Sequence, residues 1–212
     1  SSLEPIELSD RLLELYQDDK MCPHFHMSIQ SANTDVLANM KRKYTQKDVI
    51  DSLSKIYKRL RNPFVGMDVI VGFPTETHEQ FEDTFLTLAD LPWTKIHVFP
   101  YSERPGTRAA GFTESVITQQ KQLRASRLRD LSLQRFETMG RAQIDTHKKV
   151  LVLKRSAKGG QALSRDYWPV QIIGADDFIE SWSGQEIDVR ITNYDHSNKA
   201  HMEGHLLGMV LT

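Results

Sequence analysis

Phe64 to Gly72 is the segment that most constrains the fold of this chain. Its sequence, FVGMDVIVG, is almost continuously apolar. Such a run is typical of a strand that is covered on both faces, usually in a parallel sheet. Thr77 and Gln80 follow at the spacing of a capping box, which marks the start of a helix. Thr45 and Asp48 resemble a similar box before the apolar pattern at 49–60. The segment therefore predicts a buried strand that leads into a helix.

Strands and helices alternate over the N-terminal part of the chain. His24–Ile29 and Lys95–Pro100 have strand patterns, and apolar residues at helical spacing predict helices at 49–60, 81–88 and 116–139. This order indicates a parallel α/β layer. About three strands cannot close a barrel and leave unpaired edges. We therefore expect either that the chain is part of a longer protein or that another copy of the chain covers the sheet edges. The absence of an initial methionine favours the first alternative.

The pattern changes after Gly140. Short strand patterns at 150–153, 168–173, 187–192 and 201–210 alternate with turn signals, among them Gly159-Gly160. They predict an all-β module that begins near Asp145. The expected organisation is an α/β domain at 1–142 and a small β domain at 145–212.

Composition excludes several classes of protein. Lys and Arg number 27 and Asp and Glu 28, so the chain is not a uniformly basic nucleic-acid-binding protein, although a local basic patch is allowed. The single cysteine, Cys22, excludes an internal disulfide framework and a cysteine-only metal site. It is typical of a reducing compartment, so we expect a cytoplasmic protein. No apolar run is long enough to span a membrane.

Polar residues at the strand ends mark a candidate site. Gln30 follows the first strand, and the carboxyl ends of strands hold the active sites of α/β barrels. Asp68 lies inside an apolar strand, where a carboxylate needs partners and is often functional. Gly72 lets backbone approach a ligand closely, or it only shapes the turn. His24 and His26 share a strand face, but no third ligand is evident, so we expect no metal site.

Two basic features suit anions. Arg104 follows the third strand and could hold a carboxylate or phosphate, although a solvated surface arginine is the alternative. A second strip combines positive charge for phosphates with aromatic rings for unpaired bases, which suits RNA. A solvated edge with two core aromatics is the alternative there. The strip consists of Lys148, Lys149, Lys154, Arg155, Lys158 and Arg165 with Tyr167 and Trp168.

Four stretches occur together in one order: SSLEP, HFHMSIQSANTDVLANMKRKYT, GMDVIVGFPTETHEQFEDT and HVFPYSERPGT. This order resembles the methylthiotransferase branch of the radical S-adenosylmethionine (SAM) enzymes. The β module resembles the TRAM domain, the small RNA-binding barrel that ends these enzymes. MKRKYT and Ser28-Ile29-Gln30 are most similar to the bacterial tRNA branch, whose substrate is threonylcarbamoyladenosine beside the anticodon.

The resemblance implies a fold and a reaction. The fold is the C-terminal half of a radical SAM (TIM-like) barrel with parallel strands, followed by a TRAM barrel. Family members bind 4Fe–4S clusters through two cysteine triads, cleave SAM to a radical and insert a methylthio group, while the protein positions and shields the cofactors. The implied partners are the anticodon arm of tRNA and an N-terminal, cluster-binding half.

The chain departs from the family pattern in one decisive way. Neither cysteine triad is present, and Cys22 lies where the family has no cluster ligand. The chain alone is therefore expected to hold no cluster and to be inactive. Ser28 replaces a usual proline, and Ala32 and Thr75 replace usual glycines, which narrows the backbone freedom at both positions.

The resemblance also assigns roles to residues, with no catalytic residue among them. Contacts to SAM are expected at Ser2, Glu4, Gln30, Asp68, Gly72, Phe99 and Tyr101. Contacts to the substrate or RNA are expected at Arg104, Thr107, Lys148, Lys149, Lys154, Arg155, Lys158, Arg165 and Tyr167. Two alternatives stay open: a methylthiotransferase that modifies an aspartate of a ribosomal protein, and a fragment that only binds RNA.

Overall fold

The computed structural model describes residues 2–156, 159–174, 180–196 and 204–211, without the side chains at 154–156 and 159. The chain divides into two compact units. The first consists of Ser1–Met21 and Phe25–Ser132, and the second of Cys22–His24 and Leu133–Thr212. Each unit is described by itself. The lysines and arginines predicted at 154, 155 and 158 lie outside the described side chains, so their roles stay predictions.

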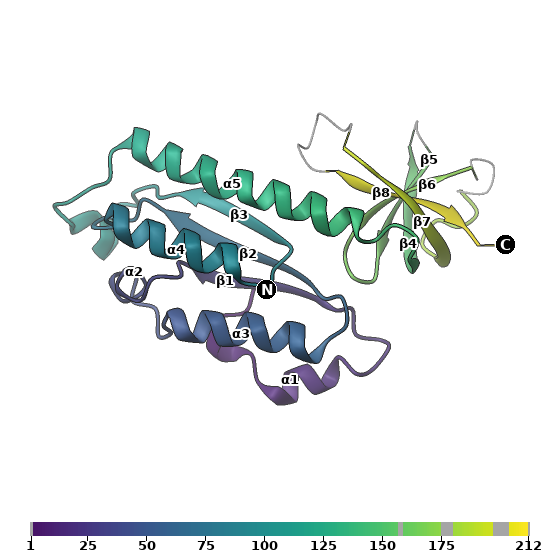
Figure 1. Ribbon diagram of the computed structural model, residues 1–212, viewed down its shortest axis with the longest axis horizontal. Helices are drawn as coiled ribbons and strands as arrows, with labels where there is room; N and C mark the ends of the chain where they lie inside the picture. The colour runs from purple at the N-terminus through teal and green to yellow at the C-terminus, as the bar shows by residue number, and fades with distance from the viewer. Residues whose placement is uncertain (1, 157–158, 175–179, 197–203, 212) are drawn as a thin grey trace. The chain divides into compact units, whose positions relative to one another are not determined.

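A three-stranded parallel sheet forms the centre of the first unit (Figure 1). Its order is β1 (His24–Gln30), β2 (Phe64–Val71) and β3 (Lys95–Pro100). β2 and β3 pair in parallel from Gly66 opposite Lys95 onwards. The predicted α/β layer with parallel strands is confirmed.

The helices follow the predicted order. The short segments η1 (Pro5–Glu7) and α1 (Asp10–Leu15) precede β1, α2 (Thr34–Asn39) and α3 (Gln46–Arg59) connect β1 to β2, and α4 (His78–Asp90) connects β2 to β3. The 3₁₀ segment η2 (Arg108–Gly111) and the long helix α5 (Thr118–Arg141) follow β3. The capping boxes predicted at the starts of α3 and α4 are both present. No helix among the described residues is long and apolar enough to cross a membrane.

The sheet has one apolar and one polar face. Met27, Met67 and Ile96 are buried in a core that also contains apolar residues of α3, α4 and α5. On the opposite face of β2, Phe64 and Gly66 are buried, whereas Asp68 and Ile70 are only partly buried. The expectation that β2 is covered on both faces therefore holds for its first half and is wrong at Asp68 and Ile70. A strand with one polar residue in an apolar run is hard to distinguish by sequence from one that is buried on both faces.

Side chains of α5 satisfy one edge of β3. Ser132 Oγ accepts a hydrogen bond from the Ile96 amide at 2.9 Å. Arg129 Nη2 donates to the Val98 carbonyl at 3.2 Å. Because these backbone groups are occupied, that edge of β3 is protected from pairing with a further strand.

A small closed barrel forms the second unit, with the strand order β4-β5-β6-β8-β7. The predicted small β module is present, while its identity as a TRAM domain stays a prediction. One strand was missed, because Gly159-Gly160 looked like a turn but pairs with Arg155 and Ser156. The strands are β4 (His147–Ser156), β5 (Gly159–Ser164), β6 (Pro169–Ile173), β7 (Glu186–Asp195) and β8 (His205–Val210).

Candidate functional site

A pocket with a volume of about 440 Å³ opens on the polar side of the sheet, near the carboxyl ends of its strands. It brings together residues from β1, β2, β3 and the loop that follows β3. Six of the predicted site residues line it: Gln30, Asp68, Phe99, Tyr101, Arg104 and Thr107. The other lining residues are Ile70, Pro100, Ser102 and Ala109. Polar residues that are up to 77 positions apart in the sequence (30 to 107) therefore share one cavity.

Gln30 is the last residue of β1 and is held in an unusual conformation. Its φ is 59°, in the left-handed region that non-glycine residues rarely adopt. The Tyr44 hydroxyl donates to the Ser28 carbonyl at 2.7 Å, two residues before Gln30. Burial raises the pKa of the Tyr44 phenol above its ordinary value, so this donor keeps its proton. Strained residues of this kind cluster at binding sites.

Asp68 has a polar partner in His26, which agrees with the expectation that a carboxylate in an apolar strand needs one. His26 Nε2 lies 3.0 Å from Asp68 Oδ2, and the two side chains are 33% and 23% exposed. The rings of His26 and His97 are 5.5 Å apart on the same face. No group of three His, Cys, Asp or Glu residues in the described chain could hold a metal.

The remaining pocket residues combine a cation with aromatic rings. Phe99 is 50% exposed on the cavity wall. The Tyr101 hydroxyl is buried and has no hydrogen-bond partner. Arg104 forms no ion pair with a carboxylate in the part of the chain that the structure describes. Carboxylate, guanidinium, amide and rings are the groups that recognise a zwitterion joined to a nucleoside, so this donor set fits SAM.

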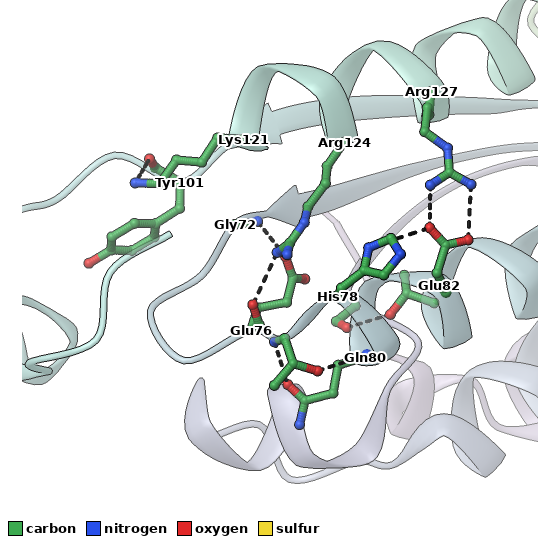
Figure 2. A network of polar contacts seen from close by, with 12 residues as sticks. Gly72, Glu76, His78, Gln80, Glu82, Tyr101, Lys121, Arg124 and Arg127 are labelled. Carbon is green, nitrogen blue, oxygen red and sulfur yellow. Dashed lines mark hydrogen bonds and ion pairs between the residues drawn. The ribbon is translucent and has the colours of Figure 1, made fainter. Parts of the chain in front are cut away.

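The turn after β2 is built on a buried ion pair (Figure 2). Glu76 Oε2 accepts from the Gly72 amide at 2.6 Å and from Arg124 Nη1 at 2.5 Å. Burial raises the pKa of Glu76, against the lowering by Gly72 and Arg124, and its side chain is 1% exposed. The sequence interpretation did not assign these two residues a role. Gly72 does not line the pocket, and its amide is used by Glu76.

Thr75 belongs to the same turn and explains a departure from the family pattern. Its φ is 74°, so this position requires the conformation that glycine adopts without strain. Asn39 Nδ2 donates to the Thr75 hydroxyl at 2.9 Å. The chain thus keeps the turn with a strained residue and a side-chain hydrogen bond.

Ser2 and Glu4 lie outside the residues that line the pocket. The Ser28 hydroxyl donates to Ser2 Oγ at 2.7 Å. Arg42 Nη1 lies 2.6 Å from Glu4 Oε1. Both side chains are therefore engaged within the chain, Ser2 with a residue of β1 and Glu4 with a residue that follows α2.

The three basic residues of the strip whose side chains are described are all paired with carboxylates. Lys148 forms a buried ion pair with Asp166, in which the two side chains are 8% and 12% exposed. Its ammonium is therefore not available to a phosphate in this structure. Lys149 Nζ lies 3.7 Å from Asp188, and Arg165 holds Glu186 through two hydrogen bonds of 2.8 and 2.6 Å.

The two aromatic residues of the strip differ. Trp168 is 2% exposed, and its ring lies 4.7 Å from that of Phe136. Trp168 therefore belongs to the core, which is the alternative to a role in RNA binding. Tyr167 is 46% exposed, and one face of its ring is stacked on the ring of His24 at 3.7 Å between centres.

Known proteins resemble this chain in sequence and fold. The sequence pattern of the radical SAM superfamily matches residues 2–88. The tRNA-2-methylthio-N(6)-dimethylallyladenosine synthase of Geotalea uraniireducens is 34% identical over 162 residues, 76% of this chain and 37% of that protein. The threonylcarbamoyladenosine tRNA methylthiotransferase MtaB of Bacillus subtilis is 42% identical over 133 residues, 62% of this chain and 30% of that protein.

A solved structure supports the fold alone. The coproporphyrinogen III oxidase HemN of Escherichia coli, a radical SAM enzyme, aligns with a TM-score of 0.50 and 19% identity, over 66% of this chain and 32% of its own. The curated relatives are longer than this chain, which spans between 23% and 47% of their lengths.

Proposed function

Because the chain belongs to the radical SAM methylthiotransferase family, we propose that it is the C-terminal part of an enzyme that modifies tRNA. The proposed reaction inserts a methylthio group into threonylcarbamoyladenosine next to the anticodon. The pocket carries the proposal, because it gathers Gln30, Asp68 and Arg104 with two aromatic residues at the carboxyl ends of the strands. The 42% identity to the relative named for this nucleoside supports the substrate.

The pocket residues divide into two groups by chemistry. SAM, when bound, would supply the radical chemistry of the reaction. Gln30 and the Asp68 carboxylate would bind its polar groups, and Phe99 and Tyr101 would cover its adenine and exclude water. Arg104 and Thr107 would face the substrate, where a guanidinium suits a carboxylate or phosphate.

The iron–sulfur clusters do not fit the residues of this chain. Cys22 is its single cysteine and is exposed, and the described residues hold no group of three metal ligands. We therefore assign the clusters to an N-terminal half that is not part of this sequence. The 212 residues alone should be inactive.

The second unit is proposed to bind the anticodon arm as a TRAM domain. Lys149, Arg165 and Tyr167 are the candidate contacts with described side chains outside the core. Phosphate contacts make affinity fall with salt concentration. Binding of tRNA that does not respond to salt would remove the phosphate contacts from the proposal. We place the enzyme in the cytoplasm, where its tRNA substrate is.

One experiment tests reaction and substrate together. The complete protein, with its N-terminal half, is reconstituted anaerobically with iron and sulfide and incubated with SAM, a reductant and tRNA bearing threonylcarbamoyladenosine. Mass spectrometry of the nucleosides should show a methylthio gain on that nucleoside. Formation of 5′-deoxyadenosine without a modified nucleoside would favour a ribosomal-protein substrate. Absence of both products, with clusters present, would leave a fragment that only binds RNA.

A further inference from the structure

Lys121 lies near the start of α5 and contacts the segments that follow two strands of the sheet (Figure 2). Its side chain runs past Gly72, which follows β2, and reaches Tyr101, which follows β3. The pocket lining includes Tyr101 but not Lys121. Lys121 therefore touches the wall of the pocket from outside.

Gly72 makes room for the stem of this lysine. A Cβ atom at Gly72 would lie 2.4 Å from Lys121 Cγ and 3.2 Å from Cδ, far inside van der Waals contact. Any larger residue would push the lysine away. The missing side chain of Gly72 thus serves the packing of Lys121, in addition to the left-handed turn at a φ of 71°.

The ammonium of Lys121 holds Tyr101 in two ways. Nζ donates a hydrogen bond to the Tyr101 carbonyl at 3.3 Å, and it lies 5.1 Å from the centre of the Tyr101 ring. No carboxylate pairs with Lys121 among the residues described, so its charge is not engaged elsewhere. The Tyr101 amide donates to Val71 at 2.8 Å. Backbone and ring of Tyr101 are therefore both fixed.

We propose that Lys121 is a positioning residue that sets Tyr101 in the wall of the ligand pocket. Tyr101 lines the pocket, and its hydroxyl is buried without a partner among the described residues, so a shift of its ring changes the shape of the wall that a ligand contacts. Lys121 acts through Tyr101 and touches no ligand itself. This role rests on the proposed function, because the ligand is taken to be SAM.

The test separates charge from packing. Lys121→Met keeps an unbranched stem but removes the donor and the charge, whereas Lys121→Arg keeps both. The dissociation constant for SAM is measured on the complete, cluster-loaded protein, and the melting temperature on each variant of the 212-residue chain. Lys47→Met is the matched control, because Lys47 is 81% exposed on α3.

Lys121→Met should weaken SAM binding about tenfold, since one hydrogen bond and one cation–π contact are lost, with an unchanged melting temperature. Lys121→Arg should restore most of the affinity, and Lys47→Met should change neither quantity. Wild-type affinity in Lys121→Met would overturn the role, as would a parallel loss of melting temperature or no rescue by arginine. Failure of the wild-type protein itself to bind SAM would instead overturn the proposed function and the role that rests on it.

Discussion

Replacing Glu76 by alanine should destabilise the α/β unit more than replacing a charged residue of an exposed ion pair. The substitution removes the acceptor of the Gly72 amide and leaves the guanidinium of Arg124, which is 7% exposed, without its carboxylate. Among the described residues Arg124 Nε has no partner, so the guanidinium keeps only the hydrogen bond from Nη1 to the Glu76 carbonyl at 3.1 Å. Removing one member of a buried ion pair costs about 3–5 kcal/mol, because the other charge stays out of water.

The assay is native-state amide exchange read by mass spectrometry on peptides from β2 and β3. These peptides report the opening free energy of the α/β unit separately from that of the barrel. Glu82→Ala is the matched control, because it breaks the pair with Arg127, whose members are 29% and 37% exposed. Exposed pairs contribute about 0–1 kcal/mol. The double variant Glu76→Leu with Arg124→Met should recover part of the loss, since both buried charges are gone while the Gly72 amide stays without its acceptor.

Two results would refute this reasoning. One is a decrease in opening free energy in Glu76→Ala that is no larger than the decrease in Glu82→Ala. The other is a double variant as unstable as Glu76→Ala alone, which would show that packing of the turn matters and the unpaired charge does not.

Three further predictions concern stability. Thr75→Gly and Thr75→Ala both lose the hydrogen bond from Asn39, but only glycine adopts a φ of 74° without strain, so the opening free energy of Thr75→Gly should be about 1 kcal/mol higher than that of Thr75→Ala; equal values for the two would argue against strain. Ser132→Ala should cost about 1–3 kcal/mol in exchange of β3 peptides, because the buried Ile96 amide loses its acceptor, and unchanged exchange would mean that water replaces the hydroxyl. The hydrogen bond from Arg127 lowers the pKa of Glu82, so the stability from this pair is complete above the ordinary glutamate pKa of about 4.3 and is lost as pH falls through the lower value of the folded state. Arg127→Met should therefore flatten the decline of the urea midpoint between about pH 5 and pH 3, and an identical decline would refute the assignment.

Local signals in the sequence predicted most of the first unit. The capping boxes of α3 and α4 need only residues three positions apart, and both are present. Gln30, Asp68 and Arg104 were found because they lie at the end of, inside and in the loop after predicted strands, and the structure brings them to one pocket. Helix caps and strand ends could be predicted because they depend mainly on residues that are close in the sequence.

Features that depend on tertiary pairing were not predictable. Glu76 and Arg124 are 48 positions apart, so no local pattern joins them. The pairing of Lys149 with Asp188 follows from the register of β4 with β7, which the sequence does not state. The composition therefore predicted the basic strip but could not show that carboxylates pair with its lysines and arginines. Gly159-Gly160 was predicted as a turn but belongs to β5. Two glycines in a strand of a small barrel cannot be distinguished by sequence from two glycines in a turn.

The affinity of the complete protein for SAM, compared between the wild type and Asp68→Ala, tests most directly whether the pocket on the polar face of the sheet binds this cofactor. Asp51→Ala is the control, because Asp51 is 58% exposed on α3. Asp68→Ala should weaken SAM binding about tenfold or more, because SAM loses a hydrogen bond to a charged group. Asp51→Ala should leave the affinity unchanged. Equal affinity in a folded Asp68→Ala protein would contradict the assignment of the pocket.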